Sequence, residues 1–210
     1  MLPDAASPDS LPTGVALHEA KRTLRTQVIG ARDALDPVYR ARASLDIVAR
    51  LQALPSFAAA RVVLVTLPFG SEWDTRSLAL AAIASGKTLV VPRVNGATRM
   101  LELHAISDIA SQIALGYRGI PEPLPAMPRV DATAVDWVLV PGVAFSLDGR
   151  RLGYGGGYYD RLMSTMASAA VRVVGAFDIQ IVARLPVAAH DLCVDLIVTE
   201  SCLLQAPLRQ

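Results

Sequence analysis

The chain has 210 residues and a mass of 22.3 kDa, a length typical of one compact domain or at most two small ones. Hydrophobic residues make up 52% of it and charged residues 19%, which provides enough apolar side chain for a core and excludes global disorder. The formal net charge of +1 and an aromatic content of 5% argue against a nucleic-acid-binding protein. We therefore expect neither nucleic acid nor membrane as a partner.

The chain has features of a cytoplasmic protein. Its clearest apolar runs are of strand length, well short of the roughly 20 residues that span a bilayer. The two cysteines, Cys193 and Cys202, are too few for a disulfide framework. The first 17 residues contain no Lys or Arg, so the basic start of a signal peptide is missing. We expect residues 1–16 to be a flexible tail and 17–210 to form a single domain.

Residues 17–54 have a helical pattern that divides at Asp36 and Pro37. Asp36 suits the N-cap of a second helix, and Pro37 suits its first helical position. The second helix is expected to bury a stripe of five residues. These are Val38, Ala41, Leu45, Val48 and Leu51.

After residue 60, short β-branched runs alternate with helical segments. Strands are expected at 61–66, 88–92, 101–104, 137–140, 171–174 and 194–198, with a helix at 74–85 that Asp74 could cap and a short helix that Ser107 could cap. This alternation predicts a mostly parallel sheet with helices on both faces. The expected fold is therefore a three-layer α/β domain.

The most informative segment runs from the strand at 137–140, through a turn expected at Asp148 and Gly149, to a helix expected from about Tyr158. Four glycines fall within the five residues 153–157, where backbone N–H groups and a helix N-terminus could approach an anion. Arg151 lies just before this loop, and Asp160, in the first turn of the helix, could hold Mg²⁺ on phosphates. The spacing matches neither a Walker A loop nor the dinucleotide fingerprint. A tight strand-to-helix connection remains the alternative.

Two other groups of polar residues are candidates for ligand binding. Lys21 and Arg25 share one face of the first helix, and they form either a solvated face or a pair of cations aimed at a polyanion. Glu72 and Asp74 follow the strand at 61–66, where open α/β sheets place their ligand sites. The three histidines have no metal-binding spacing, which argues against zinc.

With these motifs in place, the sequence resembles the 5-formyltetrahydrofolate cyclo-ligase family, also called 5,10-methenyltetrahydrofolate synthetase. The resemblance extends from about Lys21 to Val198. Its most specific pieces are Pro141–Phe145 and Arg151–Arg161. Supporting pieces, in the expected order, are Lys21–Arg25, Glu72–Thr75, Val91–Arg93, Gly119–Pro123 and the closing strand from Val194.

The resemblance implies a fold and a reaction. The fold is an α/β/α sandwich like that of ribose-phosphate isomerases and CoA-transferases. The reaction is MgATP-driven cyclisation of 5-formyltetrahydrofolate to 5,10-methenyltetrahydrofolate, with release of ADP and phosphate. ATP would phosphorylate the formyl oxygen to an iminophosphate, N10 would attack the activated carbon, and phosphate would leave. Such chemistry requires positioning and charge neutralisation more than a protein nucleophile.

The resemblance also implies roles for individual residues. ATP binding falls to Lys21, Arg22, Thr23, Leu24 and Arg25, and to Arg151, Leu152, Gly153, Tyr154, Gly155, Gly156, Gly157, Tyr158 and Tyr159. Folate binding falls to Thr66, Glu72, Tyr154, Gly155, Gly156, Gly157 and Tyr158. Asp160 and Asp191 would bind Mg²⁺, and Lys21, Arg151 and Asp160 would be catalytic. Some relatives carry a lysine where this chain has Gly156, which shifts phosphate neutralisation to Lys21, Arg25 and Arg151.

A second class of function stays open at this point. The same scaffold could be a non-catalytic module that binds a reduced folate or a phosphorylated metabolite. A pure binding protein does not need Asp160 or the Lys21/Arg25 pair, which favours the enzyme. A monomer is the simplest expected state.

Overall fold

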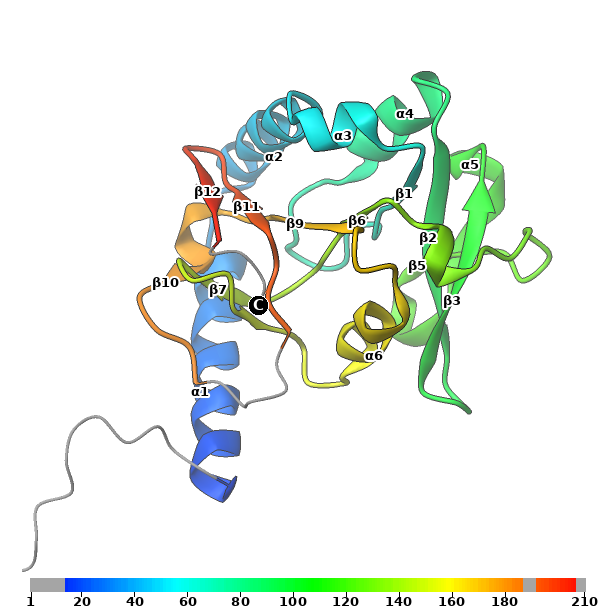
Figure 1. The fold of residues 1–210 in the computed structure, drawn as a ribbon. Coiled ribbons are helices and arrows are strands. Elements are labelled where there is room, and N and C mark those ends of the chain that lie inside the picture. The colour runs from blue at the N-terminus through cyan, green and yellow to red at the C-terminus, as the bar shows by residue number, and fades with distance from the viewer. Residues whose placement is uncertain (1–13, 187–191, 207–210) are drawn as a thin grey trace, which may run out of the picture.

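The computed structural model describes residues 14–186 and 192–206, which build an α/β domain around one large sheet (Figure 1). The strand order of this sheet is β12-β11-β9-β6-β1-β2-β3. Its bounds are β1 Val62–Leu64, β2 Thr88–Asn95, β3 Met100–Ile106, β6 Trp137–Leu139, β9 Val171–Gly175, β11 Leu196–Val198 and β12 Leu203–Gln205. The five inner strands are parallel, while the edge strands β3 and β12 run antiparallel to their neighbours. The expectation of a mostly parallel sheet is confirmed.

Two small sheets, which the sequence patterns did not predict, flank the large one. One has the order β10-β7-β8 and the other pairs β4 with β5. Their strands are β4 Ile113–Leu115, β5 Pro121–Pro123, β7 Ala144–Ser146, β8 Arg151–Leu152 and β10 Ile181–Val182. The strands are only two or three residues long, too short for a visible alternation of side chains.

Helices cover both faces of the large sheet (Figure 1). They are α1 Gly14–Asp33, α2 Pro37–Gln52, α3 Pro55–Ala59, α4 Arg76–Ala84, α5 Ile109–Gln112 and α6 Tyr158–Thr165, with single 3₁₀ turns at η1 Tyr117–Gly119, η2 Ala132–Ala134 and η3 Asp178–Gln180. On one face, α2, α3 and α4 pack with Val63, and on the other α6 packs with Leu64. Adjacent β1 residues thus belong to two separate cores, which confirms the three-layer arrangement.

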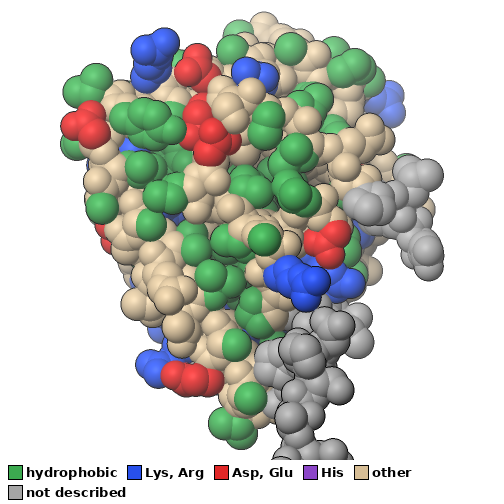
Figure 2. All heavy atoms as spheres, turned by 90° about the vertical axis from the view of Figure 1, so that its left-hand side faces the viewer, with side chains coloured by type: hydrophobic (Ala, Val, Ile, Leu, Met, Phe, Trp, Pro, Cys, Tyr) green, Lys and Arg blue, Asp and Glu red, His purple; other side chains and the backbone are tan. Residues whose placement is uncertain are grey.

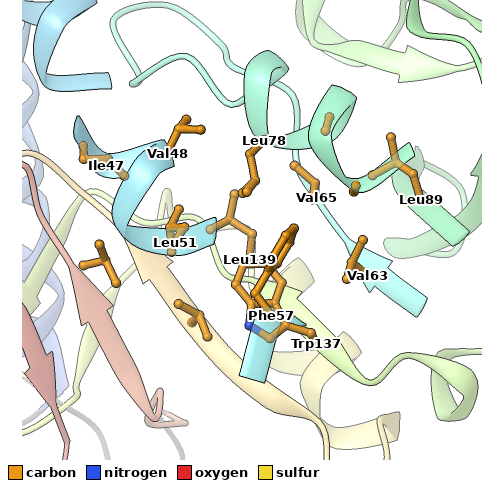
Figure 3. Packing of buried hydrophobic residues seen from close by; sticks show 14 of the residues in the cluster. Ile47, Val48, Leu51, Phe57, Val63, Val65, Leu78, Leu89, Trp137 and Leu139 are labelled. Atoms are coloured by element: carbon orange, nitrogen blue, oxygen red, sulfur yellow. The ribbon is translucent and has the colours of Figure 1, made fainter. Parts of the chain in front are cut away.

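The core beneath α2, α3 and α4 is dense and built around aromatic rings. Figure 3 shows Leu51 of α2 next to Leu139 of β6, with Phe57 and Trp137 close by, and Ile47 of α2 belongs to the same cluster. The rings of Phe57 and Trp137 meet edge to face with centroids 5.2 Å apart. Such ring pairs add stability to a core in addition to the free energy gained by burying their apolar surface. This layer therefore holds β6 firmly at Trp137, its first residue.

The predicted division of the first two helices is confirmed, but part of the predicted stripe on α2 is wrong. The Asp36 carboxylate accepts hydrogen bonds from two backbone N–H groups at the start of α2. However, Val38 and Leu45 are 77% and 62% exposed, and Ala41 is exposed as well, so of the predicted stripe only Val48 and Leu51 are buried. The buried face instead includes Ser44, a polar residue that periodicity in hydrophobic residues cannot reveal. Its hydroxyl donates to the Arg40 carbonyl and accepts from the Asp74 amide, so its burial leaves no unpaired group.

Two predicted helix caps are displaced by one residue. The cap position of α4 is Thr75 rather than Asp74, although the Asp74 carboxylate still accepts the N–H of Arg76. The cap of α5 is Asp108 rather than Ser107. The two carboxylate oxygens of Asp108 accept hydrogen bonds from two backbone N–H groups of the helix. The single hydroxyl of a serine is shorter and offers only one oxygen.

The outer surface of α1, α2 and the β12 edge carries hydrophobic side chains between separate charged ones, as Figure 2 shows. Among its exposed apolar residues are Val38 and Leu45 on α2 and Leu203 on β12. Within the described part of the chain, no helix combines the length and the hydropathy that crossing a bilayer requires.

Candidate active site

A narrow cavity opens at the carboxyl edge of the parallel sheet. Its walls come from the segment after β1 (Thr66 and Glu72), the segment after β6 (Pro141 and Gly142) and the end of β9 (Gly175). About 30 Å³ is accessible within it, the share of roughly one water molecule. Ligands of open α/β proteins bind in this position, at the carboxyl ends of the strands.

The glycine-rich loop lies beside this cavity and leads directly into α6. It follows the β7–β8 hairpin, whose predicted turn is confirmed at Gly149 with φ +80°. Gly155 and Gly157 have φ +98° and +67°, a region that side-chain-bearing residues rarely adopt. Gly157 is the cap residue of α6, so the helix begins at Tyr158 as predicted. The loop therefore combines backbone freedom with a helix N-terminus.

Helix α1 brings its cationic face to this loop. The Arg25 Nε donates to the Gly153 carbonyl at 2.7 Å, across 128 residues of sequence. Lys21 lies one turn earlier on the same face of the helix. By contrast, Arg22 is exposed and pairs with Glu19 at 2.5 Å, and Leu24 packs against the small sheet. Thr23 is exposed as well. The Lys21–Arg25 run is thus split between a loop-facing side and a solvated side.

Arg151 and Asp160 form an ion pair at the base of the loop. The Arg151 Nη2 and an Asp160 carboxylate oxygen lie 2.5 Å apart, and the Arg151 side chain is only 5% exposed. The Arg151 Nη1 also donates to the Pro141 carbonyl at 3.2 Å, which fixes the guanidinium under the segment after β6. The Asp160 side chain remains 36% exposed, so solvent still reaches this residue of the first turn of α6.

Tyr154 connects the loop to Glu72. Its hydroxyl donates to Glu72 Oε1 at 2.5 Å, and the Phe69 amide donates to Glu72 Oε2 at 3.0 Å. Burial raises the pKa of Glu72, whereas these two hydrogen bonds and the charge of Arg32 act in the opposite direction. Burial and the neighbouring carboxylate raise the pKa of Tyr154 well above its usual range, so its hydroxyl stays protonated.

Tyr159 and Thr66 meet at the other wall of the cavity. Their hydroxyl oxygens lie 2.5 Å apart, and the Thr66 carbonyl accepts from the Thr75 hydroxyl at 2.7 Å. The centroid of the Tyr158 ring lies 6.4 Å from that of Tyr117, a residue of η1. Burial raises the pKa of Tyr159 strongly, so this hydroxyl is also neutral.

Sequence reasoning missed two buried polar residues of the cavity wall, Arg32 and Gln180. Arg32 continues the stripe of Lys21, Arg25 and Val28 on α1, and this spacing could have identified it. The Gln180 amide donates to the Val143 carbonyl at 3.0 Å, and no local pattern indicates this contact. Asp191 lies outside the described residues.

The described residues contain no group of three or more His, Cys, Asp or Glu side chains that could hold a metal ion. Mg²⁺ does not require such a group, because it is usually bound by one or two carboxylates together with substrate phosphates. The accessible carboxylate of Asp160, beside the glycine loop, fits that requirement.

Fold and cavity together define a three-layer α/β protein with a glycine-rich loop and a half-buried acid at the carboxyl edge of its sheet. Comparison with known proteins names the family. The sequence profile of the 5-formyltetrahydrofolate cyclo-ligase family matches residues 17–200, and the chain belongs to this family.

Individual relatives agree with this assignment. A 5-formyltetrahydrofolate cyclo-ligase of Escherichia coli strain K12 is 31% identical over 176 residues, which cover 81% of this chain and 94% of that one. The 5-formyltetrahydrofolate cyclo-ligase of Mus musculus is 27% identical over 196 residues, which cover 89% of this chain and 96% of that one. The NMR structure of Aquifex aeolicus 5,10-methenyltetrahydrofolate synthetase matches with a TM-score of 0.80 and 34% sequence identity. The match covers 90% of this chain and 94% of that one. The recognised family and the fold class are confirmed.

Proposed function

We propose that the protein catalyses the ATP-dependent cyclisation of 5-formyltetrahydrofolate to 5,10-methenyltetrahydrofolate. Family membership supports the reaction. The observation that carries the assignment to this site is the position of the glycine loop, which contacts α1 through Arg25 and the half-buried Glu72 through Tyr154. A nucleotide on one side of the loop and a folate on the other would meet at its centre.

The proposed chemistry proceeds in two displacements. The formyl oxygen attacks the γ-phosphorus of ATP and the bond to ADP breaks, which gives an iminophosphate. N10 then attacks the formyl carbon and loses its proton, which the departing phosphate can take up, while the carbon–oxygen bond breaks and phosphate leaves with that oxygen. Each step is favoured by holding the reacting groups in place and by neutralising phosphate charge.

The residues divide between the two substrates. We assign the triphosphate to Lys21, Arg25, Arg151 and the N–H groups of the glycine loop. Arg22, Thr23 and Leu24 complete that segment of α1, but their exposure or packing makes a direct contact less favourable. Asp160, with Asp191 as a second ligand, would hold Mg²⁺, which supplies charge neutralisation when bound with ATP.

The folate is assigned to the cavity beside Glu72. An ionised carboxylate can accept two N–H bonds from a planar pterin edge, and Glu72 is the acid that lines this cavity. Thr66, Tyr154 and Tyr158 would border the ring system.

The first test is a near-ultraviolet absorbance trace with 5-formyltetrahydrofolate and MgATP, against a control without ATP. We expect an ATP-dependent rise as methenyltetrahydrofolate forms. Asp160→Ala and Arg151→Ala should each lower kcat at least about 100-fold while the thermal unfolding transition remains cooperative. A flat trace from folded protein would favour the non-catalytic folate-binding module, and calorimetry with folate and nucleotide would then test that function.

We further infer a cytoplasmic monomer. Both cysteines are free, which suits a reducing compartment. All the residues assigned above come from one chain, so a second copy is not needed to complete the site. Light scattering on the active protein tests the monomer directly.

A further inference from the structure

Arg32 is a buried cation next to the proposed folate site. It lies in the last turn of α1 and is 4% exposed. Burying a guanidinium is costly unless its N–H groups are paired. Its Nε donates to the Ser71 hydroxyl at 2.9 Å, and its Nη2 donates to the Tyr154 hydroxyl oxygen at 3.2 Å. Both partners belong to the cavity region rather than to α1.

Both partners of Arg32 are next to Glu72, one in the sequence and the other through a hydrogen bond. Ser71 precedes Glu72 in the chain, and its hydroxyl donates to the carboxylate of Asp33, next to Arg32 on α1. Tyr154 uses its single hydroxyl proton on Glu72 Oε1. The hydroxyl oxygen of Tyr154 therefore accepts from Arg32 while its proton goes to Glu72. This gives a continuous chain of hydrogen bonds from Ser71 through Arg32 and Tyr154 to the acid.

We propose that Arg32 is a positioning residue of the folate site, which orients the Glu72 carboxylate by holding the Tyr154 hydroxyl against it. This inference rests on the proposed function, because it assigns Arg32 to the acid that binds the folate. A planar, two-ended guanidinium can contact Ser71 and Tyr154 at once, whereas a lysine ammonium on a flexible stem cannot reproduce that geometry. Ser71 and Asp33 fix Arg32, and Arg32 in turn fixes Tyr154.

Arg32 also contributes charge. The charged and titratable groups around Glu72 are Arg32 from α1, Tyr154 from the loop, Tyr159 from α6, and the ion pair at the start of α4; Asp33 is one step further away, bonded to Ser71. That ion pair joins Asp74 and Arg76 at 2.7 Å. The positive charge of Arg32 opposes the effect of burial on the pKa of Glu72. Removing the charge should raise that pKa further and move the acidic limb of kcat/KM for folate to higher pH.

A double-mutant cycle on the full-length enzyme tests the proposal. Arg32→Lys and Tyr154→Phe should each raise the KM for 5-formyltetrahydrofolate by about tenfold, with a smaller change in kcat and an unchanged KM for ATP. Because Arg32 acts through Tyr154, the double variant should resemble Tyr154→Phe alone. Effects that multiply to about 100-fold would overturn the proposal.

The pH profile separates positioning from a merely structural role. Arg32→Gln should move the acidic limb of the kcat/KM profile to higher pH. Arg32→Lys keeps the charge, so its acidic limb should lie at the wild-type pH while its folate KM stays raised. An unmoved limb in Arg32→Gln would contradict the electrostatic part. Arg42→Gln, on the exposed face of α2, is the matched control and should leave KM, kcat and the pH profile unchanged.

If the Arg32 variants do not fold, Ser71→Ala provides the second route, since it removes the group that fixes the guanidinium. Ser71→Ala should raise the folate KM and be non-additive with Tyr154→Phe, and an unchanged KM would overturn the proposal. A wild-type enzyme without ATP-dependent turnover would instead contradict the proposed function, so the two failures are distinguishable.

Discussion

At the scale of single residues, Gly175 shows how tightly the floor of the cavity is packed. The Trp73 indole Nε1 donates to the Gly175 carbonyl at 2.6 Å, so the ring lies directly over the end of β9. A Cβ at this position would lie 2.4 Å from Trp73 Cζ2 and 3.1 Å from a methyl of Ile47. Both neighbours are buried, so neither can move without disturbing the core.

We expect Gly175→Ala to lower the free energy of unfolding by about 1–3 kcal/mol, because overpacking forces buried groups apart. Since Trp73 follows Glu72, the folate KM should rise as well. The matched control is Gly30→Ala on the exposed face of α1, where an added Cβ meets nothing within 4 Å. That change should stabilise the helix by about 0.5–1 kcal/mol. Urea unfolding of both variants checks the pair, and equal midpoints would contradict the prediction.

At the scale of elements, α2 is defined by its first residues. Asp36 Oδ1 accepts from the Val38 amide at 2.9 Å and from the Tyr39 amide at 3.0 Å. Pro37 at the first helical position has no N–H to leave unpaired. The chain can therefore turn sharply after α1 and place α2 on the sheet.

We expect Asp36→Ala to destabilise the protein by about 1 kcal/mol, because two N–H groups lose their acceptor. Asp36→Asn keeps an oxygen in place and should restore most of that loss. Asp46→Ala, on the exposed side of the same helix, controls for removal of a carboxylate. Thermal unfolding of the three variants measures the effect, and a loss in Asp46→Ala as large as in Asp36→Ala would argue against capping.

At the scale of the whole molecule, a polar contact ties α2 to the far end of the sheet. The Tyr39 hydroxyl donates to Glu200 Oε1 at 2.6 Å, across 161 residues of sequence. The same carboxylate accepts from the Asp178 amide at 3.0 Å. The hydrogen bond to Glu200, followed by burial and by the carboxylate charges, raises the pKa of Tyr39 from 10.0 to about 12.

This shift predicts a loss of stability at alkaline pH. Because the folded state favours neutral Tyr39, its contribution is complete below pH 10.0 and disappears as the pH rises through about 12. The difference in unfolding free energy between wild type and Tyr39→Phe should therefore shrink over that range. Tyr39 is 43% exposed, so solvent keeps the difference small. Urea titrations at a series of pH values measure it, and a constant difference would contradict the linkage.

Local patterns predicted the parts of this fold that depend on near neighbours in sequence. The Asp36–Pro37 helix start, the Gly149 turn and the start of α6 at Tyr158 were all correct, because caps and turns are set within a few residues. The same reasoning failed for the buried face of α2. Ser44 is buried there through a contact with Asp74, which lies 30 residues away.

In the candidate site, too, some features follow from the sequence and others only from the tertiary structure. The sequence by itself determined the α/β class, the glycine loop and the family resemblance, since these follow from hydrophobic spacing and from a contiguous motif. Only the tertiary structure decided that Arg25 and not Arg22 faces the loop, and that Arg32 and Gln180 line the cavity. Such contacts join residues far apart in the chain, and the packing of α1 on the sheet edge selects which side chains meet.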